Sequence, residues 1–293
     1  MGTMANDEPS LELLWGTFTG YQRTFALKAA VELDVFTAIA AGATTIAALA
    51  ERTHAAPRGL RALLNHLVMD GFLTREGDRY GLTATTAAFL DRASPAYLGS
   101  GITFVTSPML VDAFTRLTDA VRRGGTAVPD GGTLAPEHPV WVEFARAMAP
   151  LAGMTAVLLA NHLDAEHAPA WKILDVAAGH GLFGITLARM NPRATVVALD
   201  WRNVLTVAEE HARAAGVQAR FRTLPGSAFD VAWGDGYDVV LLPNFLHHFD
   251  VPTCEQILSK AHAALRPGGR VVVVEFVPDP DRSGPPDACG SRC

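Results

Sequence analysis

The chain has 293 residues, 49% of them hydrophobic, and a formal net charge of −6. Its length predicts about two domains of roughly 100–200 residues each, and its apolar content excludes an intrinsically disordered protein. The acidic balance gives no support to nucleic-acid binding. Three cysteines, two of them among the last five residues, exclude a disulfide framework and predict a reduced, cytoplasmic protein. The longest uncharged stretch, residues 93–111, contains two prolines and two glycines, so we predict no membrane span.

The first hundred residues predict a small, mostly helical domain. We expect a long helix over residues 22–40, which lack proline and glycine, and a short one at Ile46–Thr53. A third helix begins at Pro57, and five apolar residues share one of its faces: Leu60, Leu63, Leu64, Leu67 and Val68. A turn at residues 76–78 between two short apolar runs predicts a hairpin. Two short helices followed by a hairpin describe a winged helix-turn-helix domain over residues 1–100.

A winged helix often binds DNA, but the charge of this one opposes that function. Residues 1–100 contain 8 basic and 10 acidic residues. The expected recognition helix offers only Arg58 and Arg61 to phosphate groups. We therefore favour a dimerisation module and expect a homodimer that binds no nucleic acid. A DNA-binding regulator stays open as the less favoured alternative.

Residues 101–165 are predicted to be connecting helices. The stretch Val121–Pro139 is rich in glycine, proline and threonine, which predicts a loop, and a helix follows over Trp141–Leu163. Large apolar side chains recur along this helix at helical spacing: Phe144, Met148, Leu151, Met154 and Leu158. Such a stripe favours a buried face, and the wall of a substrate pocket is the alternative.

From residue 166 to residue 280, apolar runs alternate with helical segments. The runs lie at residues 171–176, 194–199, 237–242 and 270–276. The helical segments lie at Leu182–Met190, Val204–Ala215 and Thr253–Leu265. This alternation predicts an α/β, Rossmann-like domain with a mostly parallel sheet. Pro267–Gly269 is expected to form a tight turn into a buried fourth strand, and residues 281–293 are expected to be an irregular tail.

The first apolar run leads into a glycine-rich turn. Gly179, Gly181 and Gly184 have the G-x-G-x-x-G spacing between a strand and a helix, which lets the backbone approach a ligand closely. Asp200 ends the second run, where a carboxylate accepts hydrogen bonds from ribose hydroxyls. Asp175 precedes the first glycine by four residues, and a carboxylate there suits a cationic or amino-bearing ligand. A nicotinamide oxidoreductase is therefore the least favoured function, because its pyrophosphate would pass this position.

In combination, these motifs resemble the S-adenosylmethionine-dependent O-methyltransferases of the caffeate and hydroxyindole type, from about residue 10 to about residue 283. The resemblance implies a class I methyltransferase domain behind a winged-helix-like dimerisation domain. It implies S-adenosyl-L-methionine as the cofactor and a hydroxyl of a small aromatic or polyketide-type molecule as the acceptor. The family continues after the fourth run with a helix and a final antiparallel strand pair, which we expect this chain to lack. A homologue with lost or altered activity therefore stays open as an alternative.

The resemblance also implies which residues bind the cofactor. Asp175, Gly179 and Gly181 correspond to the loop around its methionine part, and Asp200 corresponds to the acid that binds the ribose. The other cofactor-binding positions, most of them near the adenine, are Trp201, Ser227, Ala228, Phe229 and Asn244. The family commonly has an aspartate where this chain has Ser227, and a core position for Phe229 stays open.

For the chemistry, the resemblance implies a general base at His247 and an acidic partner for it at Glu275. A phenol has a pKa of about 10, and an imidazole with an ordinary pKa near about 6.5 accepts its proton as the methyl group is transferred. A carboxylate behind the imidazole fixes its tautomer. The resemblance assigns four residues to the acceptor pocket: Phe144, Met148, Phe245 and His248. No metal site is expected, because Cys289 and Cys293 have no obvious further ligands.

Overall fold

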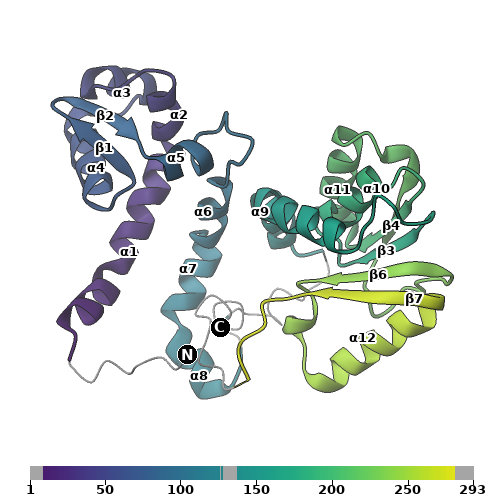
Figure 1. Ribbon diagram of the computed structural model, residues 1–293. Helices are drawn as coiled ribbons and strands as arrows, with labels where there is room; N and C mark the ends of the chain where they lie inside the picture. Colours follow the sequence, from purple (N-terminus) through teal and green to yellow (C-terminus); the bar gives the residue numbers. More distant parts are fainter. Residues whose placement is uncertain (1–8, 126, 128–136, 281–293) are drawn as a thin grey trace. The chain divides into compact units, whose positions relative to one another are not determined.

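The structure is a computed structural model that describes residues 9–125, 127 and 137–280. It divides into two compact units, Met1–Ala127 and Val128–Cys293, each with its own hydrophobic core (Figure 1). The division lies inside the region 101–165 that the sequence predicts to be connecting helices. The predicted tail at 281–293, with its two cysteines, and residues 126 and 128–136 of the predicted loop lie outside the described residues.

The first unit is a set of helices with one β-hairpin. Its elements are α1 (Leu11–Glu32), α2 (Val35–Ala40), α3 (Ile46–Thr53), α4 (Pro57–Met69), β1 (Leu73–Glu76), β2 (Arg79–Leu82), α5 (Ala84–Phe89), α6 (Ser100–Val105), α7 (Pro108–Thr115) and α8 (Leu117–Arg123). The Thr45 side chain caps α3 by accepting a hydrogen bond from the Ala48 N–H. Leu60, Leu64 and Leu67 of α4 are at most 2% exposed. Together, α3, α4 and the antiparallel pair β1–β2 confirm the predicted winged-helix arrangement.

The prediction of one continuous helix over residues 22–40 is wrong. Asp34 has φ 55°, in the left-handed region, and this residue separates α1 from α2. A helix of L-residues cannot continue through that conformation. The Arg92 guanidinium donates a 2.9 Å hydrogen bond to the Asp34 carboxylate, a contact 58 residues away that local periodicity does not reveal. The predicted loop is also wrong at its start, because α8 extends to Arg123.

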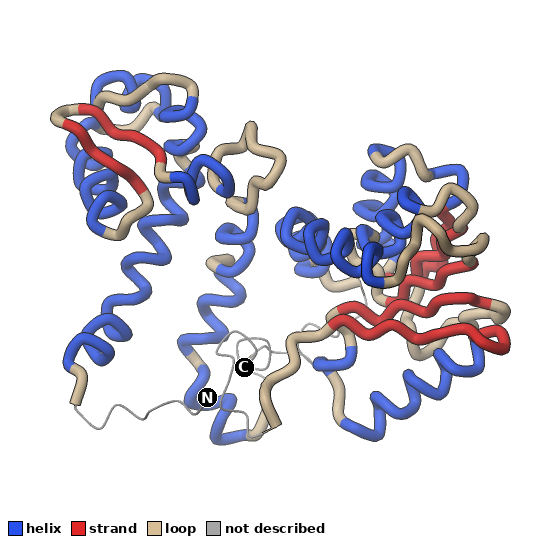
Figure 2. The backbone as a smooth tube through the Cα atoms, viewed as in Figure 1, coloured by secondary structure: helices blue, strands red, loops and turns tan. Residues whose placement is uncertain are grey.

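The second unit is built on a five-stranded parallel sheet (Figure 2). Its elements are α9 (Val140–His162), β3 (Lys172–Val176), α10 (Leu182–Met190), β4 (Thr195–Asp200), α11 (Arg202–Ala214), η2 (Gln218–Arg220), β5 (Phe221–Pro225), β6 (Tyr237–Pro243), η3 (Leu246–His248), α12 (Val251–Ala264) and β7 (Leu265–Val274). The strand order is β5-β4-β3-β6-β7, and every neighbouring pair is parallel. This confirms the predicted Rossmann-like domain, and it adds the strand β5, which the sequence patterns do not predict.

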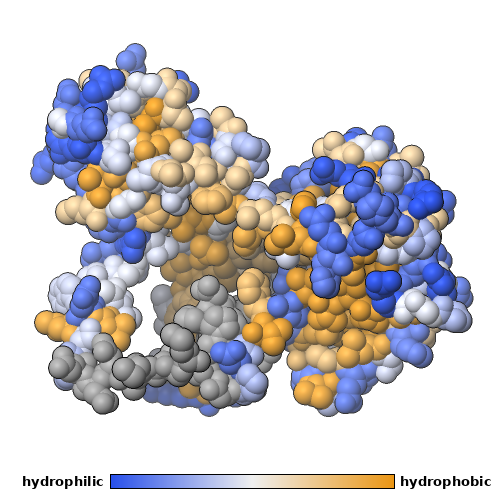
Figure 3. All heavy atoms as spheres, in the orientation of Figure 1, coloured by the Kyte–Doolittle hydropathy of each residue, from blue (hydrophilic) through white to orange (hydrophobic). Residues whose placement is uncertain are grey.

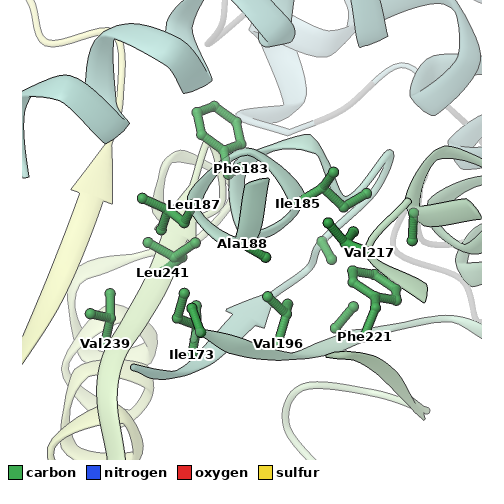
Figure 4. Packing of buried hydrophobic residues seen from close by; sticks show 14 of the residues in the cluster. Ile173, Phe183, Ile185, Leu187, Ala188, Val196, Val217, Phe221, Val239 and Leu241 are labelled. Carbon is green, nitrogen blue, oxygen red and sulfur yellow. The ribbon is translucent and has the colours of Figure 1, made fainter. Parts of the chain in front are cut away.

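Helices cover both faces of this sheet. Figure 4 shows Ile173, Val196 and Leu241 of the strands packed beneath Phe183 and Leu187 of α10. The alternate residues Leu174, Val240 and Leu242 face the other side and pack with Ile257 and Ala261 of α12. Because side chains alternate along each strand, burial on both faces requires the near-continuous apolar runs that the sequence contains.

The predicted buried stripe of α9 is wrong for three of its five residues. Leu151, Met154 and Leu158 are 42%, 51% and 70% exposed. The buried positions are instead small: Ala145, Ala149, Ala156 and Ala160. Alanines let α9 approach the helix it packs against closely, so the large residues lie on its outer face. Among the described residues, α9 is also the helix that is long and apolar enough, by length and composition alone, to cross a membrane.

The fourth predicted strand also differs from expectation. Pro267–Gly269 lie within β7, beside a register irregularity opposite Tyr237 and Val239, and not in a separate turn. Gly268 has φ 78°, and a Cβ on Gly269 would lie 2.8 Å from the carbonyl oxygen of Tyr237. No residue of β7 is fully buried, because it lies at an edge of the described sheet. Figure 3 shows hydrophobic side chains gathered over this side of the second unit.

Candidate active site

The loop after β3 has a backbone conformation that favours glycine at two points. Gly179 and Gly181 have φ values of 56° and 72°. A Cβ on Gly181 would lie 2.9 Å from the Cβ of Ala208, and one on Gly184 would lie 3.0 Å from Asp175 Oδ2. The glycine spacing therefore serves both a tight turn and close packing of α10 and α11 around it.

Asp175 is fully buried next to this loop. Its Oδ2 accepts a 3.0 Å hydrogen bond from the Gly184 N–H. Its Oδ1 is buried with no hydrogen-bond partner in the described part of the chain. Burial, with a smaller contribution from the charge of Asp200, raises the pKa of Asp175 to about 7. A buried carboxylate oxygen without a hydrogen-bond partner lowers the stability of the fold, and a donor from a ligand would satisfy this atom.

Asp200 ends β4 and holds the glycine loop. Its Oδ2 accepts from the Gly179 N–H at 2.7 Å, and its Oδ1 accepts from the Trp201 N–H at 2.6 Å. Burial raises the pKa of Asp200 to about 6. Trp201 itself precedes α11 and packs partly buried against a small cluster that contains Val204 and Ala145. The structure thus brings the predicted acid to the predicted glycine loop.

The segment after β5 lies beside the same strand end. The Gly226 N–H donates to the Asp200 carbonyl oxygen at 2.9 Å. The Ser227 hydroxyl accepts from the Phe229 N–H at 3.1 Å. Phe229 is 45% exposed, so it is not the core residue that the alternative interpretation required. Its ring meets that of Phe249 edge to face, with 5.2 Å between the ring centroids.

His247 and Glu275 form a pair at the carboxyl ends of β6 and β7. His247 Nδ1 lies 2.7 Å from Glu275 Oε2. Glu275 Oε1 accepts from the Leu246 N–H at 2.8 Å and from the His247 N–H at 3.4 Å. The two side chains are only 14% and 12% exposed. The short helix η3 thus presents His247 to a carboxylate 28 residues away, next to the strand that leads to the glycine loop.

The environment of Glu275 keeps it ionised. Burial pushes its pKa up, but the hydrogen bond and charge of His247, with the two backbone donors, hold the pKa of Glu275 below its usual value. An ionised carboxylate accepts hydrogen bonds only, so Nδ1 of His247 carries a proton in this pair. When the ring is unprotonated at its other nitrogen, its lone pair is therefore on Nε2, the nitrogen opposite Glu275.

A series of ring contacts leads from His247 to α9. The rings of His247 and His248 lie 4.1 Å apart between centroids, and Trp141 of α9 meets His248 edge to face at 5.6 Å. Trp141 also contacts Phe144, at 5.7 Å. Burial, followed by the nearby charge of His247, lowers the pKa of His248 to about 4, so this ring is neutral.

The remaining predicted site residues lie on α9 and in the segment between β6 and η3. Phe245 packs against Phe249, with 5.0 Å between ring centroids. Met148 lies about one turn beyond Phe144 on α9 and is half-buried. Asn244 has φ 50° and turns the chain from β6 toward η3, while its N–H donates to the Val274 carbonyl oxygen at 2.7 Å.

Comparison with known families agrees with this geometry. The model of the O-methyltransferase domain matches residues 135–291, and that of the O-methyltransferase dimerisation domain matches residues 15–92. The chain belongs to the O-methyltransferase family. The first unit of this O-methyltransferase thus carries the dimerisation domain, which supports formation of a homodimer.

Three relatives indicate what this O-methyltransferase resembles. The 3-hydroxy-5-methyl-1-naphthoate 3-O-methyltransferase of Streptomyces sahachiroi is 32% identical over 94% of this chain and 80% of its own length. A proposed O-methyltransferase of Nostoc punctiforme has a solved structure that is 49% identical, covers 97% of this chain and 85% of its own, and superposes with a TM-score of 0.90. CalO1, a methyltransferase in calicheamicin biosynthesis solved with SAH bound, is 26% identical, covers 93% of this chain and 83% of its own, and has a TM-score of 0.73.

The SAH bound to CalO1 is S-adenosyl-L-homocysteine, the demethylated product of S-adenosyl-L-methionine. S-adenosyl-L-methionine is therefore the cofactor expected for this O-methyltransferase. The described residues fit such a group. Asp175 offers a buried oxygen that lacks a donor, and glycines at 179 and 181 keep side chains out of the loop. Asp200 offers further lone pairs on oxygens already held in place by two backbone N–H groups.

Two residues beside the candidate site have no role predicted from the sequence. Trp141 was assigned only as the start of a helix, although its place three residues before Phe144 puts both on one face. His180, between the two glycines, is 7% exposed, and its Nδ1 accepts from the Leu182 N–H at 3.1 Å. Burial, then the charge of His211, lowers the pKa of His180 to about 4, so it is a neutral acceptor at the start of α10.

Proposed function

We propose that this O-methyltransferase methylates a hydroxyl group of a small aromatic or polyketide-type molecule, with His247 as general base and Glu275 as its partner. The observation that carries the proposal is the 2.7 Å contact between His247 Nδ1 and Glu275 Oε2 beside the glycine loop. The Streptomyces sahachiroi relative acts on a hydroxynaphthoate, which supports an aromatic acceptor.

In this proposal His247 removes the acceptor's proton. Glu275 holds the Nδ1–H, so Nε2 faces the acceptor hydroxyl and takes its proton as the oxygen attacks. S-adenosylmethionine supplies a methyl group already activated on a sulfonium. The imidazolium that forms is stabilised by the ionised Glu275, and both groups are shielded from water by their burial. The residues therefore align and deprotonate the acceptor.

The cofactor would be held by three segments at the same end of the sheet. Asp175, Gly179 and Gly181 would surround its methionine part. Asp200 would accept from the ribose hydroxyls. Beside them, the residues proposed to complete the site are Trp201, Ser227, Ala228, Phe229 and Asn244. Oδ1 of Asp175 has no hydrogen-bond partner within residues 9–125, 127 and 137–280, which supports this assignment because an ammonium or hydroxyl donor would satisfy it.

The acceptor would lie among aromatic side chains near His247. Phe144, Met148, Phe245 and His248 are proposed to line its pocket. The neutral ring of His248 and the aromatic ring that it contacts favour a planar ring system as the acceptor.

The proposed assembly is a soluble cytoplasmic homodimer that binds neither nucleic acid nor a membrane. Large side chains along α1 are exposed in the single chain, among them Leu11, Leu14, Trp15 and Phe18. A surface with this much exposed apolar area fits a partner subunit.

A transfer assay with methyl-labelled S-adenosylmethionine and a panel of phenols, naphthols and polyketide-type hydroxyls tests the function. We expect label on the oxygen of at least one aromatic acceptor. Tight binding of SAH without transfer to any acceptor of the panel would favour a homologue with altered activity and count against the proposal.

Cofactor binding is expected to release protons. Burial gives Asp175 and Asp200 folded pKa values of about 7 and about 6, above the unfolded value near about 3.9. The cofactor-free protein therefore binds more protons folded than unfolded between about pH 4 and pH 7, and its stability falls as pH rises through that window. Donors on the cofactor favour the ionised carboxylates, so SAH should stabilise the fold more at about pH 8 than at about pH 5.5.

Titration calorimetry in two buffers of different ionisation enthalpy measures this release. At about pH 6.5 the apparent enthalpy of SAH binding should differ between the buffers, and Asp175→Asn should reduce the difference. Equal enthalpies in both buffers would contradict the assignment of these carboxylates to the cofactor site.

A further inference from the structure

Lys260 of α12 reaches across to the segment that follows β5. Its Nζ donates to the carbonyl oxygen of Ala228 at 2.8 Å and to that of Phe229 at 2.9 Å, 32 and 31 residues earlier in the chain. The same ammonium lies over the ring of Trp233, 5.2 Å from its centroid. Hydrogen bonds from an ionised donor are stronger than neutral ones, so Lys260 fixes two successive carbonyl groups in space.

Trp233 anchors this contact in the core. The ring is 4% exposed, and its Nε1 donates to the same Ala228 carbonyl oxygen at 2.9 Å. The Tyr237 hydroxyl donates to the Trp233 carbonyl oxygen at 2.8 Å, which ties the tryptophan to the start of β6. The Ala228 carbonyl oxygen therefore accepts hydrogen bonds from two donors. One is Lys260 of α12, and the other is Trp233, which is buried in the core beneath α12.

The held segment has no helix or strand of its own. Residues 226–230 lie between β5 and β6, and their backbone hydrogen bonds are those of a turn, from the Asp230 and Val231 N–H groups to the Ser227 carbonyl oxygen. The carbonyl groups of Ala228 and Phe229 accept from side chains. The Phe229 side chain extends from this backbone with nearly half of its surface exposed, and its ring contacts Phe249 just after the η3 turn. Lys260 thus controls where the exposed Phe229 ring lies relative to the end of the sheet.

We infer that Lys260 is a positioning residue for the cofactor, because its ammonium fixes the Ala228 and Phe229 backbone in the conformation that flanks the adenine. This inference rests on the proposed function, in which Ser227, Ala228 and Phe229 border that ring. Lys260 acts through this backbone and stays away from His247. Its loss should therefore weaken cofactor binding and leave the chemical step unchanged.

The chain contains a matched control. Lys172, at the opposite end of the sheet, also donates to a backbone carbonyl, that of Asp235 at 2.6 Å, and also lies over a ring, 4.3 Å from the centroid of Tyr237. Lys172→Met removes the same kinds of contact as Lys260→Met, but it leaves both donors to the Ala228 carbonyl, Lys260 Nζ and Trp233 Nε1, in place. Lys260→Arg keeps a charged donor beside the carbonyl oxygens of Ala228 and Phe229.

The test measures SAH affinity by calorimetry, kcat and KM for S-adenosylmethionine, and hydrogen exchange of residues 228–231 in all three variants. Lys260→Met should bind SAH about tenfold more weakly, with faster exchange in that segment. Its kcat at saturating cofactor should stay within about twofold of the wild type. Lys260→Arg should recover most of the affinity, and Lys172→Met should behave as the wild type.

Wild-type affinity in Lys260→Met, or an equal loss in Lys172→Met, would overturn the positioning role while the proposed function stands. A loss in kcat with unchanged KM would also overturn it. Failure of the wild-type protein itself to bind SAH would instead overturn the proposed function and the inference with it.

Discussion

Replacing His247 with alanine is expected to lower kcat for methyl transfer by about a hundredfold or more and to leave SAH affinity unchanged. The imidazole is the group whose Nε2 faces away from Glu275, so its loss leaves the acceptor hydroxyl without a base. Glu275 keeps its two backbone donors from Leu246 and His247, so the turn itself should persist. Label transfer under saturating cofactor measures the rate, and calorimetry measures the affinity.

His262 is an exposed histidine on α12, so His262→Ala is the matched control and should retain the wild-type rate. Glu275→Gln keeps an acceptor for Nδ1–H but loses the charge that stabilises the imidazolium, so it should fall between the wild type and His247→Ala. A His247→Ala variant with wild-type kcat would rule out the proposed base.

Replacing Asp200 with alanine is expected to weaken SAH binding by at least about thirtyfold. The substitution removes the proposed acceptor for the ribose. It also leaves the N–H groups of Gly179 and Trp201 without the carboxylate that holds them. Both effects act on the cofactor loop, so the KM for S-adenosylmethionine should rise more than kcat falls.

Asp238→Ala provides the comparison for Asp200→Ala. Asp238 accepts from the Lys172 N–H at 2.7 Å at the start of β6, away from the glycine loop. Its loss also frees a backbone donor, but SAH affinity should not change. Undiminished SAH binding by a folded Asp200→Ala variant would exclude the ribose role.

The elements predicted well are those with a strong local signal. α3 begins after a capping threonine and α10 follows the glycine turn, and both have the predicted bounds. β5 has no such signal, because Phe221–Pro225 contains an arginine and a proline and lies at an edge of the sheet. Its hydrogen bonds to β4 make it a strand, and that pairing is invisible in a five-residue window.

Failures of the helix predictions have the same origin. The break at Asp34 accompanies a contact with Arg92, 58 residues away. On α9 the large apolar residues predicted an inner face, but close packing selected the alanines. Local hydrophobicity measures what a residue prefers, whereas the shape of the neighbouring surface decides which face it can use.

By itself, the sequence determined the alternation of strands and helices, the glycine turn, and the acids at the ends of two strands. These follow from local periodicity and from backbone conformations that only certain residues adopt. The tertiary structure decided which of those groups meet. The register of β6 beside β7 brings His247 to Glu275, and the packing of α12 brings Lys260 to Ala228 and Phe229. It also left Asp175 Oδ1 buried without a hydrogen-bond partner among the described residues, because burial and hydrogen bonding depend on contacts between distant segments.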